Sequence, residues 1–305
     1  MYTDQYGKTW VKLAFHQHST CSDGRATPEE IANLYRKAGY DAVALTDHWV
    51  WRDAGKINGM PILSGCEYHT PCNRGGTAHH DGRNGVYHIV ALCCDREPDL
   101  KRETTDGPQQ VIDAIHAAGG LAILGHPAWS FNTPEQILKL RDIDAVEIFN
   151  TNSVCGNNRR GDSSDTIDQV AVHGDVLLPI SGADDSHRYN QMANNRPDYC
   201  ATFVMAECED VSPESIKQAI RERRFYTSQG PEICLSRKGN RFVVDSSPVS
   251  EIAFFSNLVV DSGAVLVGKK LTHFEYETEK SELHFIRARV TDAKGRMAWS
   301  QYIRV

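Results

Sequence analysis

Residues 11–18 read VKLAFHQH, a short apolar run followed at once by two histidines. Side chains of a β-strand alternate between its two faces, so residues i and i+2 point to the same side. If Val11–Phe15 forms a strand, His16 and His18 leave its carboxyl end on one face. The sequence therefore predicts that two imidazoles converge at this strand end.

The same arrangement recurs up to about residue 190, where short apolar runs alternate with polar loops and segments of helical spacing. This alternation predicts βα units and a parallel sheet or barrel, whose strand ends open onto one face. The later runs are Ala42–Leu45, Ile62–Leu63, Ile89–Leu92, Leu121–Leu124, Ala145–Phe149 and Val176–Ile180. Asp47, His48, Glu67, His126, Asp185 and His187 follow the ends of such runs, and His88 directly precedes the run Ile89–Leu92.

Histidines and carboxylates that meet on one face indicate a metal centre. Six imidazoles and three carboxylates in one pocket would repel one another and lose hydration, and divalent ions relieve both costs. Mixed imidazole and carboxylate ligands suit Zn, Mn or Fe. The sequence has no cluster of cysteines of the kind that holds a structural zinc ion. We therefore expect two or three divalent ions, whose identity the ligand types leave open.

The starts of three helices are marked by capping residues. Thr27-Pro-Glu-Glu30 and Thr133-Pro-Glu-Gln136 each supply a capping hydroxyl, a proline at the first helical position and an acid or amide two residues later; Ser212-Pro-Glu214 opens a third helix. After about Gly230 the pattern changes to alternating segments separated by Gly, Ser, Asp and Lys. The sequence predicts an α/β domain that holds the metal centre over residues 1–230 and a small antiparallel β domain over residues 231–305.

Composition narrows the class of protein. The 305 residues are 40% hydrophobic and 24% charged, as in ordinary globular proteins. No run approaches a membrane span, the first residues lack the apolar core of a secretory signal, and the nine cysteines include no CxxC pair, so we expect a cytoplasmic protein with reduced thiols and no membrane partner. A formal net charge of −7 disfavours a nucleic-acid polymer as partner.

Residues in the rim loops are candidates for substrate binding. Arg159, Arg160 and Arg188 would suit a phosphate, although solvated arginines fit the sequence as well. His79 and His80, together with His69, belong to a long loop rich in Gly, Asn and Arg. Such a loop serves as a lid, as a substrate contact or simply as a solvated connection.

Other polar residues have more than one interpretation. Asp47, beside His48, is an acceptor bonded to a ligand, an acid for the leaving group or a structural hydrogen-bond partner. Glu147 and Asn150, at the end of the sixth run, are candidates to support the site. Four histidines outside the strand ends are interpreted as surface or core residues: His116, His173, His273 and His284.

Several motifs occur in a characteristic order: His16-Gln-His18, Ser22-Asp-Gly24, Thr46-Asp-His48, Gly65-Cys-Glu67, Gly125-His-Pro127 and Asp185-Ser-His187. Over about residues 10–230 they resemble the motifs of the PHP (polymerase and histidinol phosphatase) family. Tyr226–Pro231 and the tail that ends Ala298-Trp-Ser300 resemble the carbaryl-hydrolase-like branch of that family.

The resemblance implies a distorted, TIM-like (β/α)7 barrel with a trinuclear metal centre. Carried over by position, the resemblance implies three ligand sets: His16, His18, Glu67 and Asp185 for the first ion, Glu67, His88 and His126 for the second, and Asp23, His48 and His187 for the third. His88 is preferred to His79 and His80 because it alone adjoins an apolar run. Asp47, Glu67 and His187 are the candidate catalytic residues.

The expected activity is hydrolysis by a metal-bridging hydroxide, which would attack phosphorus or a carbonyl carbon while the ions neutralise the developing charge. The leading hypothesis is a phosphoesterase that acts on a small phosphomonoester or phosphodiester, such as a nucleotide or sugar phosphate. The alternative is a carboxylic ester, amide or carbamate hydrolase that uses the same centre. A third interpretation is a catalytically silent metal-binding module. The oligomeric state stays open.

Overall fold

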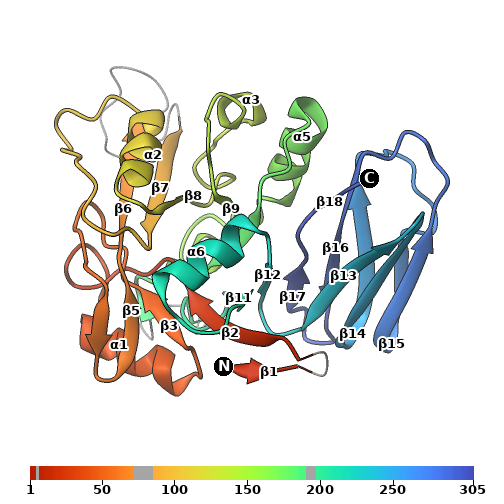
Figure 1. The fold of residues 1–305 in the computed structure, drawn as a ribbon, viewed down its shortest axis with the longest axis horizontal. Coiled ribbons are helices and arrows are strands. Elements are labelled where there is room, and N and C mark those ends of the chain that lie inside the picture. The colour runs from red at the N-terminus through yellow and green to blue at the C-terminus, as the bar shows by residue number, and fades with distance from the viewer. Residues whose placement is uncertain (5–6, 72–84, 190–196) are drawn as a thin grey trace. The chain divides into compact units, whose positions relative to one another are not determined.

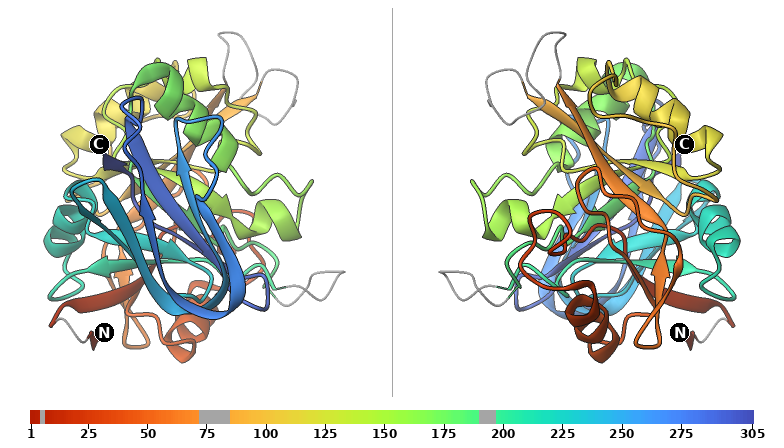
Figure 2. Two further views of the ribbon diagram at one scale, coloured as in Figure 1. Left: turned by 90° about the vertical axis from the view of Figure 1, so that its right-hand side faces the viewer. Right: turned by 90° about the vertical axis from the view of Figure 1, so that its left-hand side faces the viewer.

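The computed structural model describes residues 1–4, 7–71, 85–189 and 197–305. The chain divides into two compact units, Met1–Arg224 and Phe225–Val305, and the first contains the candidate metal-binding residues. Figures 1 and 2 show the elements of each unit, with the colour running from red at the N-terminus to blue at the C-terminus. All histidines and carboxylates at the predicted strand ends lie within these ranges, whereas the loop residues His79 and His80 lie outside them.

Two sheets form the framework of the first unit. One contains β1 (Tyr2–Thr3), β2 (Thr9–Ala14), β3 (Ala42–Ala44), β4 (Gly55–Ile57), β5 (Met60–Leu63) and β11 (Phe203–Glu207), with β2, β3 and β5 parallel. The other has the order β10-β9-β8-β7-β6 and contains β6 (Gly65–Pro71), β7 (Val86–Leu92), β8 (Leu121–Leu124), β9 (Ala145–Asn150) and β10 (Ile180–Ala183). A mixed α/β fold is therefore confirmed.

The expected parallel order is wrong at β7. This strand pairs antiparallel with both β6 and β8, whereas β8, β9 and β10 are parallel to one another. Its reversed direction explains why His88 stands at the head of its apolar run: the start of β7 lies beside the carboxyl ends of its neighbours. A closed barrel is not confirmed, because isolated bridges, Gln17 with Ser186 and His48 with Glu67, stand between the two sheets in place of continuous ladders.

Helices accompany the strands of the first unit. They are α1 (Pro28–Lys37), α2 (Pro108–Ala117), α3 (Pro134–Ile137), α4 (Thr151–Cys155), α5 (Ser164–Gly174) and α6 (Pro213–Arg221). The predicted caps are confirmed: Thr27 and Thr133 form complete capping boxes, and the Ser212 side chain accepts a hydrogen bond from the Ser215 amide. Within the described residues, no helix combines the length and apolar character needed to cross a bilayer.

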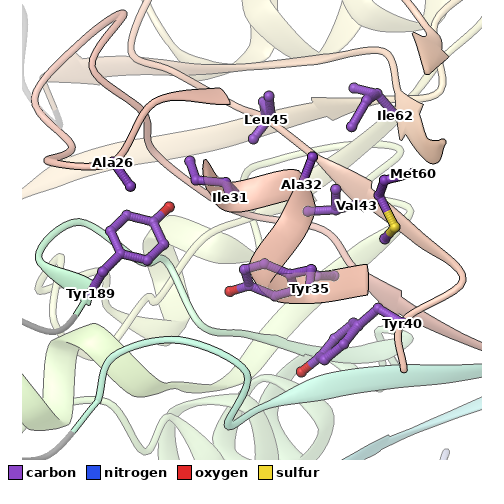
Figure 3. Packing of buried hydrophobic residues seen from close by; sticks show 11 residues of the cluster. Ala26, Ile31, Ala32, Tyr35, Tyr40, Val43, Leu45, Met60, Ile62 and Tyr189 are labelled. Atoms are coloured by element: carbon purple, nitrogen blue, oxygen red, sulfur yellow. The ribbon is translucent and has the colours of Figure 1, made fainter. Parts of the chain in front are cut away.

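A buried cluster holds α1 against the first sheet. Ile31 and Tyr35 of the helix are fully buried and pack with Val43, Met60 and Ile62 of the neighbouring strands. Figure 3 shows the rings of Tyr35 and Tyr40 side by side in this cluster, where their centroids are 4.8 Å apart. Burial of large apolar side chains contributes most of the stability of such a contact. The cluster therefore fixes α1 behind the strand ends that carry His16 and His48.

The second unit consists of antiparallel strands, as the alternating sequence predicts. They are β12 (Phe225–Ser228), β13 (Ile233–Lys238), β14 (Arg241–Ser256), β15 (Val265–Glu277), β16 (Phe285–Thr291), β17 (Met297–Trp299) and β18 (Ile303–Arg304). The long strand β14 pairs with β13, β15 and β16 along different parts of its length. Strand β12 belongs to this unit because it pairs with β17.

The capping box of α1 yields a stability prediction. Replacing Thr27 by Ala removes the hydroxyl that accepts a hydrogen bond from the Glu30 amide, at 3.2 Å. We expect Thr27→Ala to lower the free energy of unfolding by about 0.5–2 kcal/mol. Thr27→Ser keeps the oxygen and serves as the control. Urea unfolding followed by circular dichroism measures both, and equal stability of the two variants would contradict the cap.

Candidate metal centre

The nine predicted ligands gather around one cavity of about 380 Å³ in the first unit. Seven of them line its wall: Asp23, His48, Glu67, His88, His126, Asp185 and His187. The other two, His16 and His18, are fully buried and in contact with the lining carboxylates. Residues from seven separate segments of the chain thus meet at one place, as the positions at the strand ends indicate.

The first group of ligand atoms surrounds the two histidines that follow β2. The Nε2 atoms of His16 and His18 are 3.2 Å apart, and Asp185 Oδ1 lies 3.4 Å from the former and 3.2 Å from the latter. Glu67 approaches the same atoms at 3.2 and 3.1 Å. Asp185 Oδ1 and Glu67 Oε2 are buried and accept no hydrogen bond within the part of the chain that the structure describes. Imidazole nitrogens and carboxylate oxygens this close to one another form a ligand set that suits a divalent cation.

A second group forms where β6 and β7 pair. His88 Nδ1 lies 2.6 Å from Glu67 Oε1, and His126 Nε2 lies 3.4 Å from the same oxygen. The rings of His88 and His126 are 4.8 Å apart between centroids. His48 joins this group, because one ligand atom each from His48, Glu67 and His88 lies within 4.8 Å of the others. Glu67 therefore lies between the first and second groups, within 3.4 Å of histidine nitrogens from each.

The third group lies at the more open side of the cavity. Ligand atoms of His18, Asp23, His48 and His187 all lie within 4.8 Å of one another. Asp23 Oδ1 is 3.5 Å from His187 Nε2, and Asp23 Oδ2 is 3.8 Å from His48 Nε2. The structure thus places His18 beside the three residues that the motif resemblance implies for this position. The His18 ring therefore belongs to two groups: its Nε2 atom lies near Asp185 of the first group, and its Nδ1 atom lies near Asp23 of the third.

Unusual backbone conformations place several of these side chains. His126 and Asp185 have positive φ angles of 27° and 53°, which are uncommon for residues with a Cβ atom. Surrounding hydrogen bonds hold them: the His126 amide donates to Glu147 Oε2 at 3.0 Å, and the Asp185 amide donates to the His16 carbonyl at 3.0 Å. Backbone strain of this kind concentrates at functional sites, so it supports a functional role for the cavity.

A glycine permits the loop that carries Asp23. A Cβ atom on Gly24 would lie 2.3 Å from the carbonyl oxygen of His18, far inside contact distance. The Gly24 amide donates to the Ser19 carbonyl at 3.0 Å and closes the loop. The close approach of this backbone to His18 requires glycine and brings the neighbouring Asp23 to the third group.

Charges within the cluster shift the pKa values of its members. Burial raises the pKa of a carboxyl group, but His88, His16 and His48 outweigh this effect and hold the pKa of Glu67 well below its usual range. Burial opposes the charge of His187, yet Asp185 and Asp23 raise the pKa of its imidazole to about 9. The carboxylates are therefore ionised at neutral pH, and His187 holds a proton there in the absence of another cation.

Glu147 supports the centre from behind. Its carboxylate accepts hydrogen bonds from His16 Nδ1 at 2.8 Å, from the His126 amide at 3.0 Å and from Asn150 Nδ2 at 2.9 Å. A proton on Nδ1 leaves Nε2 of His16 free to act as a metal ligand. Glu147 and Asn150 therefore occupy the supporting positions that the sequence suggested for them.

Asp47 is buried and does not belong to the cavity wall. One oxygen accepts from the Ser19 amide at 2.7 Å and from the Ser22 hydroxyl at 2.8 Å, and the other accepts from the Ser19 hydroxyl at 2.6 Å. These bonds hold the loop that carries Asp23. Of the three interpretations, these contacts favour the structural hydrogen-bond partner over an acid that reaches the leaving group.

The other residues that line the cavity are Trp129, Asn152, Asn157 and Arg188. Arg188 is thus the candidate substrate residue that the structure brings to the cavity. Arg159 is exposed, and the guanidinium of Arg160 lies 4.2 Å from the centre of the Phe131 ring; neither lines the cavity. His79 and His80 lie outside the described residues.

Sequence reasoning missed Trp129 and assigned His69 to a loop. Trp129 packs edge-on against His126 and His88, with centroids 5.0 and 5.8 Å away. His69 is in β6, opposite His88, and its buried ring stacks on the His88 ring at 5.5 Å. The signal for His69 was its position two residues after Glu67, on the same face of one strand. Trp129 follows a strand end by several residues, and nothing in its spacing marks it.

Comparisons with known proteins complete the description. No family model matches the chain, and no curated protein matches it. Two solved structures resemble part of it: a protein from Bifidobacterium adolescentis, provisionally described as a metal-dependent phosphoesterase (16% identity, 61% of this chain and 92% of that one, TM-score 0.39), and an amidohydrolase from Chromobacterium violaceum with bound sulfate and no metal (15%, 58% and 87%, TM-score 0.40).

A third solved structure matches along the whole chain. It is a two-domain protein from Bacteroides vulgatus that contains a predicted PHP-like metal-dependent phosphoesterase, and it covers 100% of this chain and 97% of its own length, with 13% identity and a TM-score of 0.51. At this identity the likeness concerns the fold. The resemblance to PHP-like proteins that the ordered motifs indicate is therefore confirmed at the level of the fold.

Proposed function

We propose that this chain is a metal-dependent phosphoesterase that hydrolyses a small phosphomonoester or phosphodiester. The observation that carries the proposal is the convergence of six imidazoles with Glu67, Asp185 and Asp23 on one cavity, in groups whose ligand atoms lie within 4.8 Å of one another. Buried carboxylate oxygens without hydrogen bonds are costly unless a cation compensates them. The whole-length structural likeness to a PHP-like protein agrees with this interpretation.

The donor set fits two or three divalent ions of Mn, Zn or Fe. His16, His18, Glu67 and Asp185 would hold the first ion, and Glu67, His88 and His126 the second; the set proposed for the third is Asp23, His48 and His187. Such ions supply Lewis acidity and lower the pKa of water. The chain itself contributes the fixed orientation of each ligand, through Glu147 for His16 and through Asp47 for the loop of Asp23.

The wall of the cavity suits a small anionic substrate. Its volume of about 380 Å³ is at the lower end of the range for small-molecule sites. Arg188 offers a guanidinium next to His187, where it can bind a phosphoryl oxygen. Asn152 and Asn157 add amide groups for a polar leaving group. A nucleotide or sugar phosphate combines these features.

A carboxylic ester, amide or carbamate is the second candidate substrate. The observation that favours it is Trp129, which gives the otherwise polar wall a large apolar surface beside His88 and His126. The same metal chemistry acts on a carbonyl carbon. A screen of phosphate esters and naphthyl carbamates with Mn-loaded protein separates the two. Turnover of carbamates alone would reject the phosphoesterase, and no turnover in a broad screen would favour a catalytically silent metal-binding module.

Metal content tests the centre directly. His126→Ala removes a ligand atom 3.4 Å from the shared carboxylate oxygen of Glu67. We expect the purified variant to lose about one ion per chain and at least 100-fold in kcat, because the ions act together. His173→Ala, an exposed histidine of α5, is the matched control. Elemental analysis gives the ion count, and equal counts in both variants would contradict the proposed ligand set.

The raised pKa of His187 makes metal binding depend on pH. A metal ligand must be neutral imidazole, so a group with a pKa of about 9 releases a proton when the ion binds at pH 7. We expect Mn²⁺ affinity to increase from about pH 6 to about pH 8. In metal-free protein the charged His187 stabilises the fold below its unfolded pKa of 6.5, and that contribution is lost as the pH rises towards 9.

Calorimetric titration in buffers of different ionisation enthalpy measures the released protons. The stability of metal-free protein is followed over the same range by thermal unfolding. Mn²⁺ affinity that stays constant with pH, with no proton release, would contradict the assignment of His187 as a ligand.

Arg188 provides a test of substrate binding. Its replacement by Ala removes the cation from the cavity wall, and we expect kcat/KM for phosphate esters to fall by about 10- to 100-fold while the ion count stays unchanged. Arg141→Ala, an exposed arginine that does not line the cavity, is the control. An Arg188 variant with unchanged kcat/KM for phosphate esters but impaired carbamate hydrolysis would support the second candidate substrate.

A further inference from the structure

The hydroxyl of Tyr35 joins three buried polar side chains behind the metal centre. Tyr35 is fully buried on the inner face of α1, and its ring lies among apolar side chains in Figure 3. Its hydroxyl oxygen is 2.6 Å from Gln17 Oε1, 2.8 Å from Asp184 Oδ2 and 2.9 Å from Ser186 Oγ. So many close polar contacts at one buried atom indicate a specific role for that hydroxyl.

The three partners belong to the two segments that carry paired ligands. Gln17 separates His16 from His18, and Ser186 separates Asp185 from His187. Gln17 and Ser186 point towards α1, where both contact the Tyr35 hydroxyl, whereas Asp185 and His187 line the cavity. The two segments are also paired through their backbones: the His18 amide donates to the Ser186 carbonyl, and the Asp185 amide donates to the His16 carbonyl, both at 3.0 Å.

The proton of the Ser186 hydroxyl, one proton of the Gln17 amide and the proton of the Tyr35 hydroxyl can each be assigned to an acceptor. The Ser186 hydroxyl donates to the Asp198 carbonyl at 2.6 Å, so Ser186 offers Tyr35 an acceptor and no proton. Gln17 Nε2 is buried without a hydrogen-bond partner among the described residues. Exchanging the amide oxygen and nitrogen of Gln17 lets this nitrogen donate to the Tyr35 hydroxyl, which then donates to Asp184. The Tyr35 hydroxyl then accepts from Gln17 and donates its one proton to Asp184, with Ser186 Oγ 2.9 Å away as a second acceptor for that proton.

We propose that Tyr35 is a positioning residue that fixes the spacing between the His16–His18 and Asp185–His187 pairs and thereby sets the affinity of the metal ion between them. It acts through Gln17, Asp184 and Ser186 and touches no ligand atom. The inference rests on the proposed metal centre, but it does not depend on which substrate is hydrolysed. Residues that orient metal ligands from outside typically change metal affinity by about 10- to 100-fold.

Tyr35 and Tyr40 form a matched pair for the test. Tyr40 packs against Tyr35 in the same buried cluster, but its hydroxyl has no hydrogen-bond partner among the described residues. Tyr35→Phe and Tyr40→Phe therefore remove the same atom from neighbouring rings, and only the first removes a link to the ligand segments. Mn²⁺ affinity is measured by competition with a chelator, well below the unfolding temperature of each variant. The absorption spectrum of Co²⁺-loaded protein reports the ligand geometry.

We expect Tyr35→Phe to weaken binding of at least one ion by about 10- to 100-fold and to change the Co²⁺ spectrum, whereas Tyr40→Phe leaves both unchanged. If Tyr35→Phe lowers only the thermal midpoint, at unchanged affinity and spectrum, Tyr35 is structural and the proposal is overturned. Should Tyr35→Phe fail to fold, Gln17→Met cuts the same link from the other side and is judged by the same readouts. Absence of turnover on every substrate would reject the proposed function while leaving this inference intact.

Discussion

The buried carboxylate of Glu67 is the interaction on which the site depends. Its two oxygens lie between 2.6 and 3.4 Å from nitrogens of five imidazoles, those of His16, His18, His48, His88 and His126. A carboxylate that is 1% exposed would be strongly destabilising without compensating positive charge. Protons on the imidazoles or metal ions between them can provide that charge. Metal ions require neutral imidazoles. The hydrogen bond of His16 to Glu147 and the backbone pairing of the ligand segments orient the ligands in a way that favours metal ions over protons.

The backbone around Glu67 brings the ligands together at the expense of local backbone strain. Antiparallel pairing of β7 brings His88 to the same edge as the ends of β6 and β8, and positive φ angles turn His126 and Asp185 towards the cavity. The positive φ angles are unfavourable by themselves. Hydrogen bonds from the His126 amide to Glu147 and from the Asp185 amide to His16 offset the strain. The site is therefore held by contacts between segments that are far apart in the chain.

Two layers of polar side chains have different tasks. The inner layer offers nitrogen and oxygen atoms to the cavity, and the outer layer, which includes Glu147, Asp47 and Tyr35, engages the inner residues or the loops that carry them. Outer residues determine which nitrogen of a histidine carries the proton and how far two ligand pairs stand apart. Under the proposed function, the remaining wall, with Arg188 and Trp129, would meet the substrate, and it is here that phosphate and carbamate hydrolysis would differ.

The sequence by itself determined the features that depend on near neighbours. The i, i+2 spacing of His16 and His18, and of Asp185 and His187, assigns each pair to one face, and the caps at Thr27 and Thr133 follow from contacts within four residues. The ordered motifs also indicated the PHP-like fold. The tertiary structure alone decided the direction of β7, the place of His69 beside His88, the Trp129 wall and the junction at Tyr35. Each of these depends on how distant segments pair and pack, and spacing along one segment carries no record of that pairing.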